Sequence, residues 1–372
     1  MDAFPSQDHA ADLKDLDFES DLHSLQRTLG LNWDLKSDTF NFGVASEEKP
    51  FTRRGVLSIV NSIYDPLGFI ALVTIHGKAI LRELMQQNSD WDSPLPEEKE
   101  EMWHTWRHSL KDLSSLKISR PYTKISPLDA TQRELCVFSD ASIKAIAAVA
   151  YLKLTDTDGT SHVGFIMEKA KLTPSLEHTV PRLELCAAVL AVELAELISS
   201  EIDIHLDTTT FYTDSKVVLG YIYNKTRRFY VYVSNQILRI RRYSRPEQWQ
   251  YVLTDQNPAD IAMRFVTPAH ILDTSWLPGP KFLKHPFQGT FKGKIFQLVN
   301  PSLDTEIHPQ VLTLDTTVMS GQLGSQRFSK FSSWRSLTRA IARLIHIALL
   351  FHKNPEAMPS SCRGWHCCDA IC

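Results

Sequence analysis

Three short apolar segments follow one another in the middle of the chain, separated by residues that favour turns. They cover residues 135–139, 146–152 and 163–167, and the sequence Asp-Thr-Asp-Gly at 156–159 stands between the second and the third. Apolar runs of this length, bounded by residues that tolerate tight turns, are typical of β-strands. The sequence therefore predicts three consecutive antiparallel strands.

A long helical pattern follows these strands. Pro181 stands where the first turn of a helix tolerates proline, and apolar residues then recur at helical spacing from Leu183 to Ile198. The elements expected downstream are a strand at 211–213, helices at 216–223 and 229–243, a strand at 248–253 and a helix through 261–262. This order of elements predicts an α/β domain.

Four acidic residues lie at the edges of these elements: Asp140, Glu184, Asp214 and Asp260. Asp140 and Asp214 follow strands, whereas Glu184 and Asp260 lie near helix starts. Four carboxylates gathered at one point repel each other, so together they imply a divalent cation, and Mg²⁺ prefers oxygen ligands. The alternative is structural, because Asp214 and Asp260 could each simply cap a helix.

The sequences SDAS, PRLEL, TDSK and NPAD surround these four acids. Together they resemble the ribonuclease H domain of Pao/BEL-type LTR retrotransposon Pol polyproteins. The resemblance implies a ribonuclease H-like mixed five-stranded sheet with flanking helices over residues 132–266. It also implies that Asp140, Glu184, Asp214 and Asp260 are catalytic metal ligands for two Mg²⁺ ions, with Mn²⁺ as an alternative. The expected activity is hydrolysis of the RNA strand of RNA·DNA hybrids.

A basic strip interleaved with aromatic residues runs between Lys225 and Arg245 on a chain whose net charge is −3. A local cluster of this kind is typical of a phosphate-binding surface, although a solvated helix face would have the same composition. The partner expected here is an RNA·DNA hybrid or another nucleic acid. The expected contacts are Ser142, Ser215, Lys225, Arg227, Arg228, Arg239 and Arg242.

The flanking regions resemble other parts of the same polyproteins. A polar segment at 1–28 precedes a mainly helical region at 29–120, which begins with a hairpin and resembles the thumb and connection of a reverse transcriptase. Helices are expected there at 55–64, 73–87 and within 91–116. Residues 267–327 are expected to be a linker, and 328–372 a truncated helical lead into an integrase with an irregular Cys-rich tail. The polymerase palm is absent from the chain.

Localisation and partners follow from what the sequence lacks. Residues 1–28 have no signal-peptide pattern, so the chain is expected to be intracellular, cytoplasmic or nuclear, and not secreted. The apolar stretch at 340–351 is too short to cross a bilayer and is interpreted as an amphipathic helix, so no membrane partner is expected. The rest of the Pol polyprotein is an expected partner. The cysteine spacing at 362–372 fits no common zinc module.

Two other functions remain open from the sequence. An aspartic peptidase, a label also given to this region of Pao elements, needs the triplet Asp-Thr/Ser-Gly, and residues 156–160 and 207–209 come near it without containing it. A non-catalytic nucleic-acid-binding remnant is the second alternative. The four intact acids favour an active ribonuclease H, whereas the missing palm favours the remnant.

Overall fold

The computed structural model describes residues 26–28, 31–43, 48–85, 90–174, 178–264, 266–285, 295–309, 328 and 330–352. The chain divides into two compact units, Met1–Gln310 and Val311–Cys372. The first unit contains a five-stranded sheet, a small four-stranded sheet and the helices around them. The residues described in the second unit include the helix α8 (Trp334–His352).

The five-stranded sheet has the order β7-β6-β5-β8-β9. Strands β5 (Gln132–Ala141), β6 (Ala145–Thr155) and β7 (Ser161–Leu172) form the expected antiparallel meander. Strands β8 (Thr208–Thr213) and β9 (Trp249–Tyr251) continue the sheet in the parallel direction from β5. The mixed five-stranded sheet expected from the sequence is confirmed.

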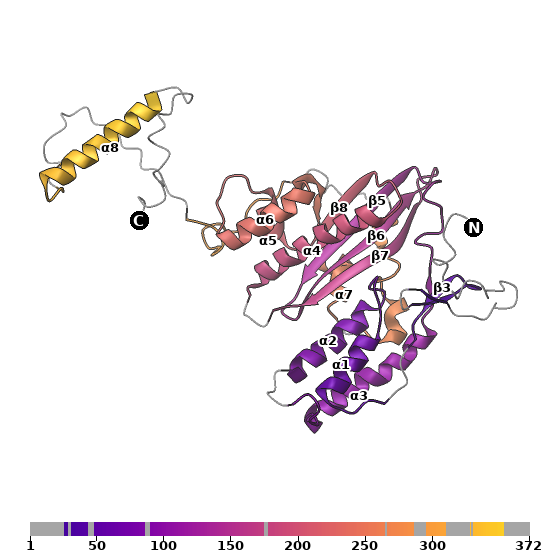
Figure 1. The fold of residues 1–372 in the computed structure, drawn as a ribbon. Helices are drawn as coiled ribbons and strands as arrows, with labels where there is room; N and C mark the ends of the chain where they lie inside the picture. The colour runs from indigo at the N-terminus through magenta and orange to yellow at the C-terminus, as the bar shows by residue number, and fades with distance from the viewer. Residues whose placement is uncertain are drawn as a thin grey trace, which may run out of the picture. The chain divides into compact units, whose positions relative to one another are not determined.

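Helices cover both faces of this sheet (Figure 1). One face carries α4 (Val180–Glu201), α5 (Lys216–Tyr223) and α6 (Val231–Tyr243). The short helix α7 (Pro258–Ile261) packs on the other face, beside the N-terminal helices. Three short 3-10 helices complete this half of the unit: η4 (Pro246–Gln248), η5 (Thr254–Gln256) and η6 (Pro268–Asp273).

Strand β5 is apolar without interruption because both of its faces are buried. Successive side chains of a strand point to opposite faces. Leu135 and Val137 join the core beneath α4, whereas Cys136 and Phe138 join the core on the other face. The strand is longer than the predicted segment 135–139, because its first residues are polar and carry no apolar signal.

The N-terminal region forms a helical layer that packs against the sheet. Its elements are β1 (Gln26–Thr28), β2 (Leu31–Asp34), β3 (Thr39–Asn41), α1 (Arg53–Ser62), α2 (Ala71–Met85), η2 (Glu97–Lys99), α3 (Glu100–Ser109), η3 (Leu110–Ser115) and β4 (Ile118–Ser119). Trp103 and Trp106 are fully buried, and the Trp106 indole N–H donates to the Val73 carbonyl at 3.0 Å. The predicted hairpin and helices, with this aromatic pair as core, are confirmed.

A turn between α1 and α2 approaches β7 closely. The Asp65 carboxylate accepts hydrogen bonds of 2.8–3.0 Å from the backbone N–H groups of residues 68–70. Gly68 has a φ of +82°, and a Cβ atom there would lie 2.7 Å from Cβ of Glu168. The Glu168 N–H donates to the Leu67 carbonyl at 2.9 Å. A side chain at position 68 would therefore separate the turn from the sheet.

Residues 267–285, which fall in the expected linker, pack into the first unit. Trp276 is fully buried, its indole N–H donates to the Phe69 carbonyl at 2.9 Å, and its own carbonyl accepts from the Tyr151 hydroxyl group at 2.6 Å. The 3-10 helix η7 (Lys281–Leu283) follows. The domain boundaries expected from the sequence stay predictions. Residues of the expected ribonuclease H-like domain and of the expected linker lie in the same compact unit.

Two expectations concern parts of the chain outside the described residues. These are the polar N-terminal segment up to residue 25 and the cysteines at 362–372. Among the helices that the structure describes, none combines the length and apolar character needed to cross a bilayer.

Candidate metal centre

Asp140 and Asp214 lie at the same end of two neighbouring strands. In the parallel pairing of β5 with β8, Ser139 stands opposite Thr213, so the two aspartates directly follow a matched pair of residues. Neighbouring strands are about 4.8 Å apart, which places these residues side by side at the edge of the sheet. Asp140 is buried, with 8% of its surface exposed, and its Oδ1 atom accepts a hydrogen bond of 2.7 Å from the Ala141 N–H.

Glu184 approaches this edge from α4. The Ser215 hydroxyl group donates to Glu184 Oε2 at 2.6 Å and accepts from the Val218 N–H at 3.1 Å. Ser215, not Asp214, is therefore the residue that caps α5. The alternative that Asp214 serves as a helix cap is therefore wrong. Ser215, its neighbour in the chain, holds the Glu184 carboxylate beside Asp214.

Asp260 reaches the same edge from α7, and it is not a helix cap. Asn257 caps α7 through a bond of 3.2 Å from the Ala259 N–H, and its side-chain amide donates to the Ser139 carbonyl at 3.1 Å. This second bond ties α7 to β5 beside Asp140. The Asp260 carboxylate forms an ion pair with Arg264 at 2.6 Å.

The electrostatics of the four carboxylates agree with their convergence. Burial, followed by the negative charge of Asp214, raises the pKa of Asp140 to about 8, and the charges of Asp260 and Glu184 add to this rise. Burial and the charge of Asp214 also raise the pKa of Glu184, although the hydrogen bond from Ser215 opposes the rise. Mutual repulsion of this kind is relieved when a cation binds.

The chemistry of these side chains fits magnesium or manganese, because all four are carboxylates and oxygen ligands suit both ions. Among the residues that the structure describes, no three His, Cys, Asp or Glu side chains already stand in a metal-holding arrangement. The Asp260 carboxylate is paired with Arg264 in this structure. Asp140, Glu184, Asp214 and Asp260 are the residues that would hold the ions.

Comparison with known protein families decides what this segment is. Residues 52–215 match the family described as "Pao retrotransposon-like RNaseH-like domain". This segment belongs to the Pao retrotransposon family. The match includes Asp140, Glu184 and Asp214, and it begins at α1, so the helices of the N-terminal layer are part of the matched segment. No curated protein matches the chain.

Solved structures similar to the chain include ribonucleases H. RNase H1 of the halophilic archaeon Halobacterium salinarum is 16% identical, with a TM-score of 0.24, over 38% of this chain and 98% of that one. LC11-RNase H1 in complex with an RNA/DNA hybrid is 16% identical, with a TM-score of 0.24, over 34% of this chain and 91% of that one. The foamy viral protease-reverse transcriptase in complex with dsDNA is 13% identical, with a TM-score of 0.37, over 61% of this chain and 44% of that one.

The structure places the nucleic-acid contacts expected from the sequence in different environments. Ser215 is buried and its hydroxyl group is used inside the protein, and the Ser142 hydroxyl group closes the turn between β5 and β6. Arg239 pairs with Glu193. The remaining expected contacts are Lys225, Arg227, Arg228 and Arg242. Arg227 is half-buried and the other three are exposed. These contacts stay predictions.

Two near-matches to the peptidase triplet have structural roles. Asp156 accepts from the backbone N–H groups of Asp158 and Thr160 and so closes the turn between β6 and β7. Asp207, just before β8, accepts from the Arg133 N–H at 2.7 Å.

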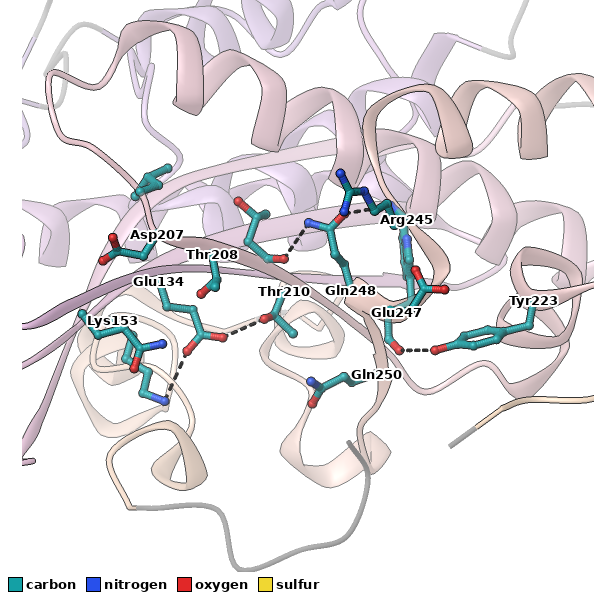
Figure 2. Close-up of a pocket in the computed structure, with 14 residues that line it drawn as sticks. Glu134, Lys153, Asp207, Thr208, Thr210, Tyr223, Arg245, Glu247, Gln248 and Gln250 are labelled. Carbon is teal, nitrogen blue, oxygen red and sulfur yellow. Dashed lines mark hydrogen bonds and ion pairs between the residues drawn. The ribbon is translucent and has the colours of Figure 1, made fainter. Parts of the chain in front are cut away.

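A separate polar groove of about 900 Å³ lies at the opposite end of β5 and β8 (Figure 2). Glu134 there forms an ion pair with Lys153 at 3.3 Å and accepts from the Thr210 hydroxyl group at 2.7 Å. Glu134 is thus paired with a cation inside the groove, as Asp260 is paired with Arg264 at the other end of the sheet.

Three residues around the site escaped sequence reasoning. Asn257 and Arg264 were not singled out, and Ser215 was expected to contact nucleic acid rather than Glu184. The Asn-Pro pair at 257–258 is a recognisable helix-start signal and could have identified Asn257. The partners of Ser215 and Arg264 depend on the tertiary fold.

Proposed function

We propose that the chain is part of a retrotransposon Pol polyprotein and carries a ribonuclease H site that cleaves the RNA strand of RNA·DNA hybrids. The observation that carries this proposal is the register of the parallel pair β5 and β8, which sets Asp140 beside Asp214. Glu184 and Asp260 reach the same edge from two helices. Magnesium, or manganese, is the cofactor that these carboxylates suit.

In this proposal the acidic side chains would position the metal ions, and the basic side chains would position the phosphates of the substrate. Asp140 is the most buried of the four acids, and Asp140, Glu184, Asp214 and Asp260 would together hold the ions through their carboxylate oxygens. When bound, a pair of Mg²⁺ ions would activate the attacking water and neutralise the leaving oxygen. The exposed basic side chains Lys225, Arg228 and Arg242 would contact the phosphates of the substrate.

The test is cleavage of a labelled RNA·DNA hybrid by the full chain with Mg²⁺. The expected result is RNA-strand cleavage that falls to background in Asp140→Asn and is unchanged in Asp158→Asn, an exposed aspartate in the turn between β6 and β7, at the end of the sheet away from Asp140. Absence of cleavage with both Mg²⁺ and Mn²⁺, or equal cleavage by the Asp140→Asn variant, contradicts the proposal.

One observation favours a second function, that of a nucleic-acid-binding remnant without catalysis. Arg264 already neutralises Asp260, so one of the four proposed ligands has a cationic partner within the protein. Fluorescence anisotropy with the same hybrid separates the two functions. Binding that Arg228→Gln weakens, without any product in Mg²⁺ or Mn²⁺, supports the remnant.

A further inference from the structure

Helix α8 presents an apolar face to solvent. Its residues Trp334, Leu337, Ile341, Leu344 and Ala348 follow each other at intervals of three and four, which places them on one face of an α-helix. Trp334 is 76% exposed and Leu344 is 65% exposed. Alternating intervals of three and four are the pattern of the a and d positions that join two helices in a coiled coil.

The charged residues of α8 lie away from this face. Arg335, Arg339 and Arg343, together with His346, occupy the b, c and f positions of the same repeat, on the far side of the helix. The e and g positions that border the apolar face hold uncharged residues: Thr338, Ala340, Ile345 and Ile347. Two such helices can therefore face each other without bringing like charges together.

The apolar residues at the a and d positions, bordered by uncharged e and g positions, fit a second copy of the same helix. A nucleic acid would bind the arginines and leave the apolar face in water. A helix that lies on a membrane surface also carries basic side chains on its polar face, so binding to lipid is the alternative outcome that the test must separate. A partner helix with the same face removes Trp334, Ile341 and Leu344 from solvent.

We propose that two copies of this chain associate through the apolar faces of their α8 helices. The seam consists of residues 334, 337, 341, 344 and 348 from each copy, and the arginines remain on the outside of the pair. This association is independent of the four acidic residues of the proposed nuclease site. It assigns to residues 334–348 a role in holding two Pol-derived chains together.

The test is the mass of the full chain in solution, measured by light scattering after size exclusion over a range of micromolar concentrations. The buffer contains a reductant, so that disulfides of the C-terminal cysteines do not link two chains. The expected result is a dimer. Leu344→Glu places a charge in the seam and is expected to weaken the association on the order of 100-fold or more.

Arg339→Glu is the matched control, because it also introduces a glutamate but on the outer side of α8, and it is expected to leave the dimer intact. Glutamate is a good helix former, so circular dichroism should show unchanged helix content in both variants. Leu344→Gln, which adds no charge, is expected to weaken the dimer to a smaller extent.

A monomeric wild-type chain overturns the proposal, whether α8 packs on its own chain or binds phosphatidylserine vesicles instead. Equal dimerisation of the wild type and Leu344→Glu overturns it as well. Dissociation caused by Arg339→Glu but not by Leu344→Glu would place the contact on the basic side of the helix and also contradict it.

Discussion

The turn at Asp65 makes the stability of the first unit depend on pH. Burial raises the pKa of Asp65 to about 6 from an ordinary value of 3.8, even though the N–H groups of residues 68–70 bond to its carboxylate and Lys78 lies nearby. Burial and the charge of Asp65 also raise the pKa of Glu168 on the neighbouring strand. Two acidic groups therefore share the junction between the helical layer and the sheet.

The sign of the effect follows from these directions. A carboxyl group with a raised pKa in the folded state holds its proton more tightly when the protein is folded. The stabilisation that the protonated Asp65 gives the folded state is therefore complete below pH 3.8 and is lost as pH rises through about 6. The difference of 2.2 pH units between 6 and 3.8 corresponds to up to about 3 kcal/mol, at about 1.36 kcal/mol per unit. Since residue 65 is partly exposed, this figure is an upper bound.

Asp65→Asn isolates this contribution. The amide keeps one acceptor for the backbone N–H groups and carries no charge, so the stability of the variant relative to wild type should rise by up to about 3 kcal/mol from pH 4 to pH 7. Urea denaturation of the full chain, followed by tryptophan emission, measures both proteins at each pH. Taking the difference between the two removes the contributions of the titrating groups that do not interact with residue 65, and Glu168, which does interact with it, needs a variant of its own.

Glu168→Gln is the companion variant. Its stability relative to wild type should rise as pH increases from the ordinary glutamate pKa of 4.5 toward the raised pKa of Glu168. A difference curve for Asp65→Asn that is flat between pH 4 and pH 7, or that falls, would refute the reasoning.

Three substitutions probe other contacts. Asn257→Ala removes the α7 cap and the bond to the Ser139 carbonyl, so urea denaturation should show a loss of about 1–3 kcal/mol, whereas Asn257→Asp should keep the cap but lose that bond. Ser215→Ala should lower hybrid cleavage and cost about 0.5–2 kcal/mol of stability, while Ser215→Thr should retain much of both. Gly77→Ala sets a Cβ atom 2.3 Å from Cζ2 of Trp106 and should cost about 1–3 kcal/mol, so an unchanged melting temperature would contradict the close α2–α3 packing.

Sequence patterns within single segments were sufficient to predict the strands and helices, but not where these elements end or which residues cap them. The apolar residues of β5 predicted a strand, but its polar start at 132–134 lies at the sheet edge and carries no apolar signal. Helix α5 agrees with its prediction at 216–223. Its cap could not be assigned, because Asp214 and Ser215 are adjacent and both residue types cap helices well. Only the fold shows that Ser215 caps the helix.

The convergence of the four acids depended on more than their spacing. Strand exits and helix starts predicted where each carboxylate stands on its own element, but the register of β5 and β8 is a long-range property. The bond from Asn257 to Ser139 and the ion pair of Arg264 with Asp260 likewise depend on how α7 sits against the sheet. Patterns within single elements contain no information about these contacts.

Trp276 has a consequence for the order in which the chain folds during synthesis. Its hydrogen bond to the Phe69 carbonyl joins residues separated by 207 positions, and its ring lies in the core shared by the helical layer and the sheet. The helices of the layer leave the ribosome long before this residue does. Until Trp276 has been synthesised, part of the apolar face of the helical layer stays exposed to solvent. The partly folded first unit is then prone to aggregation.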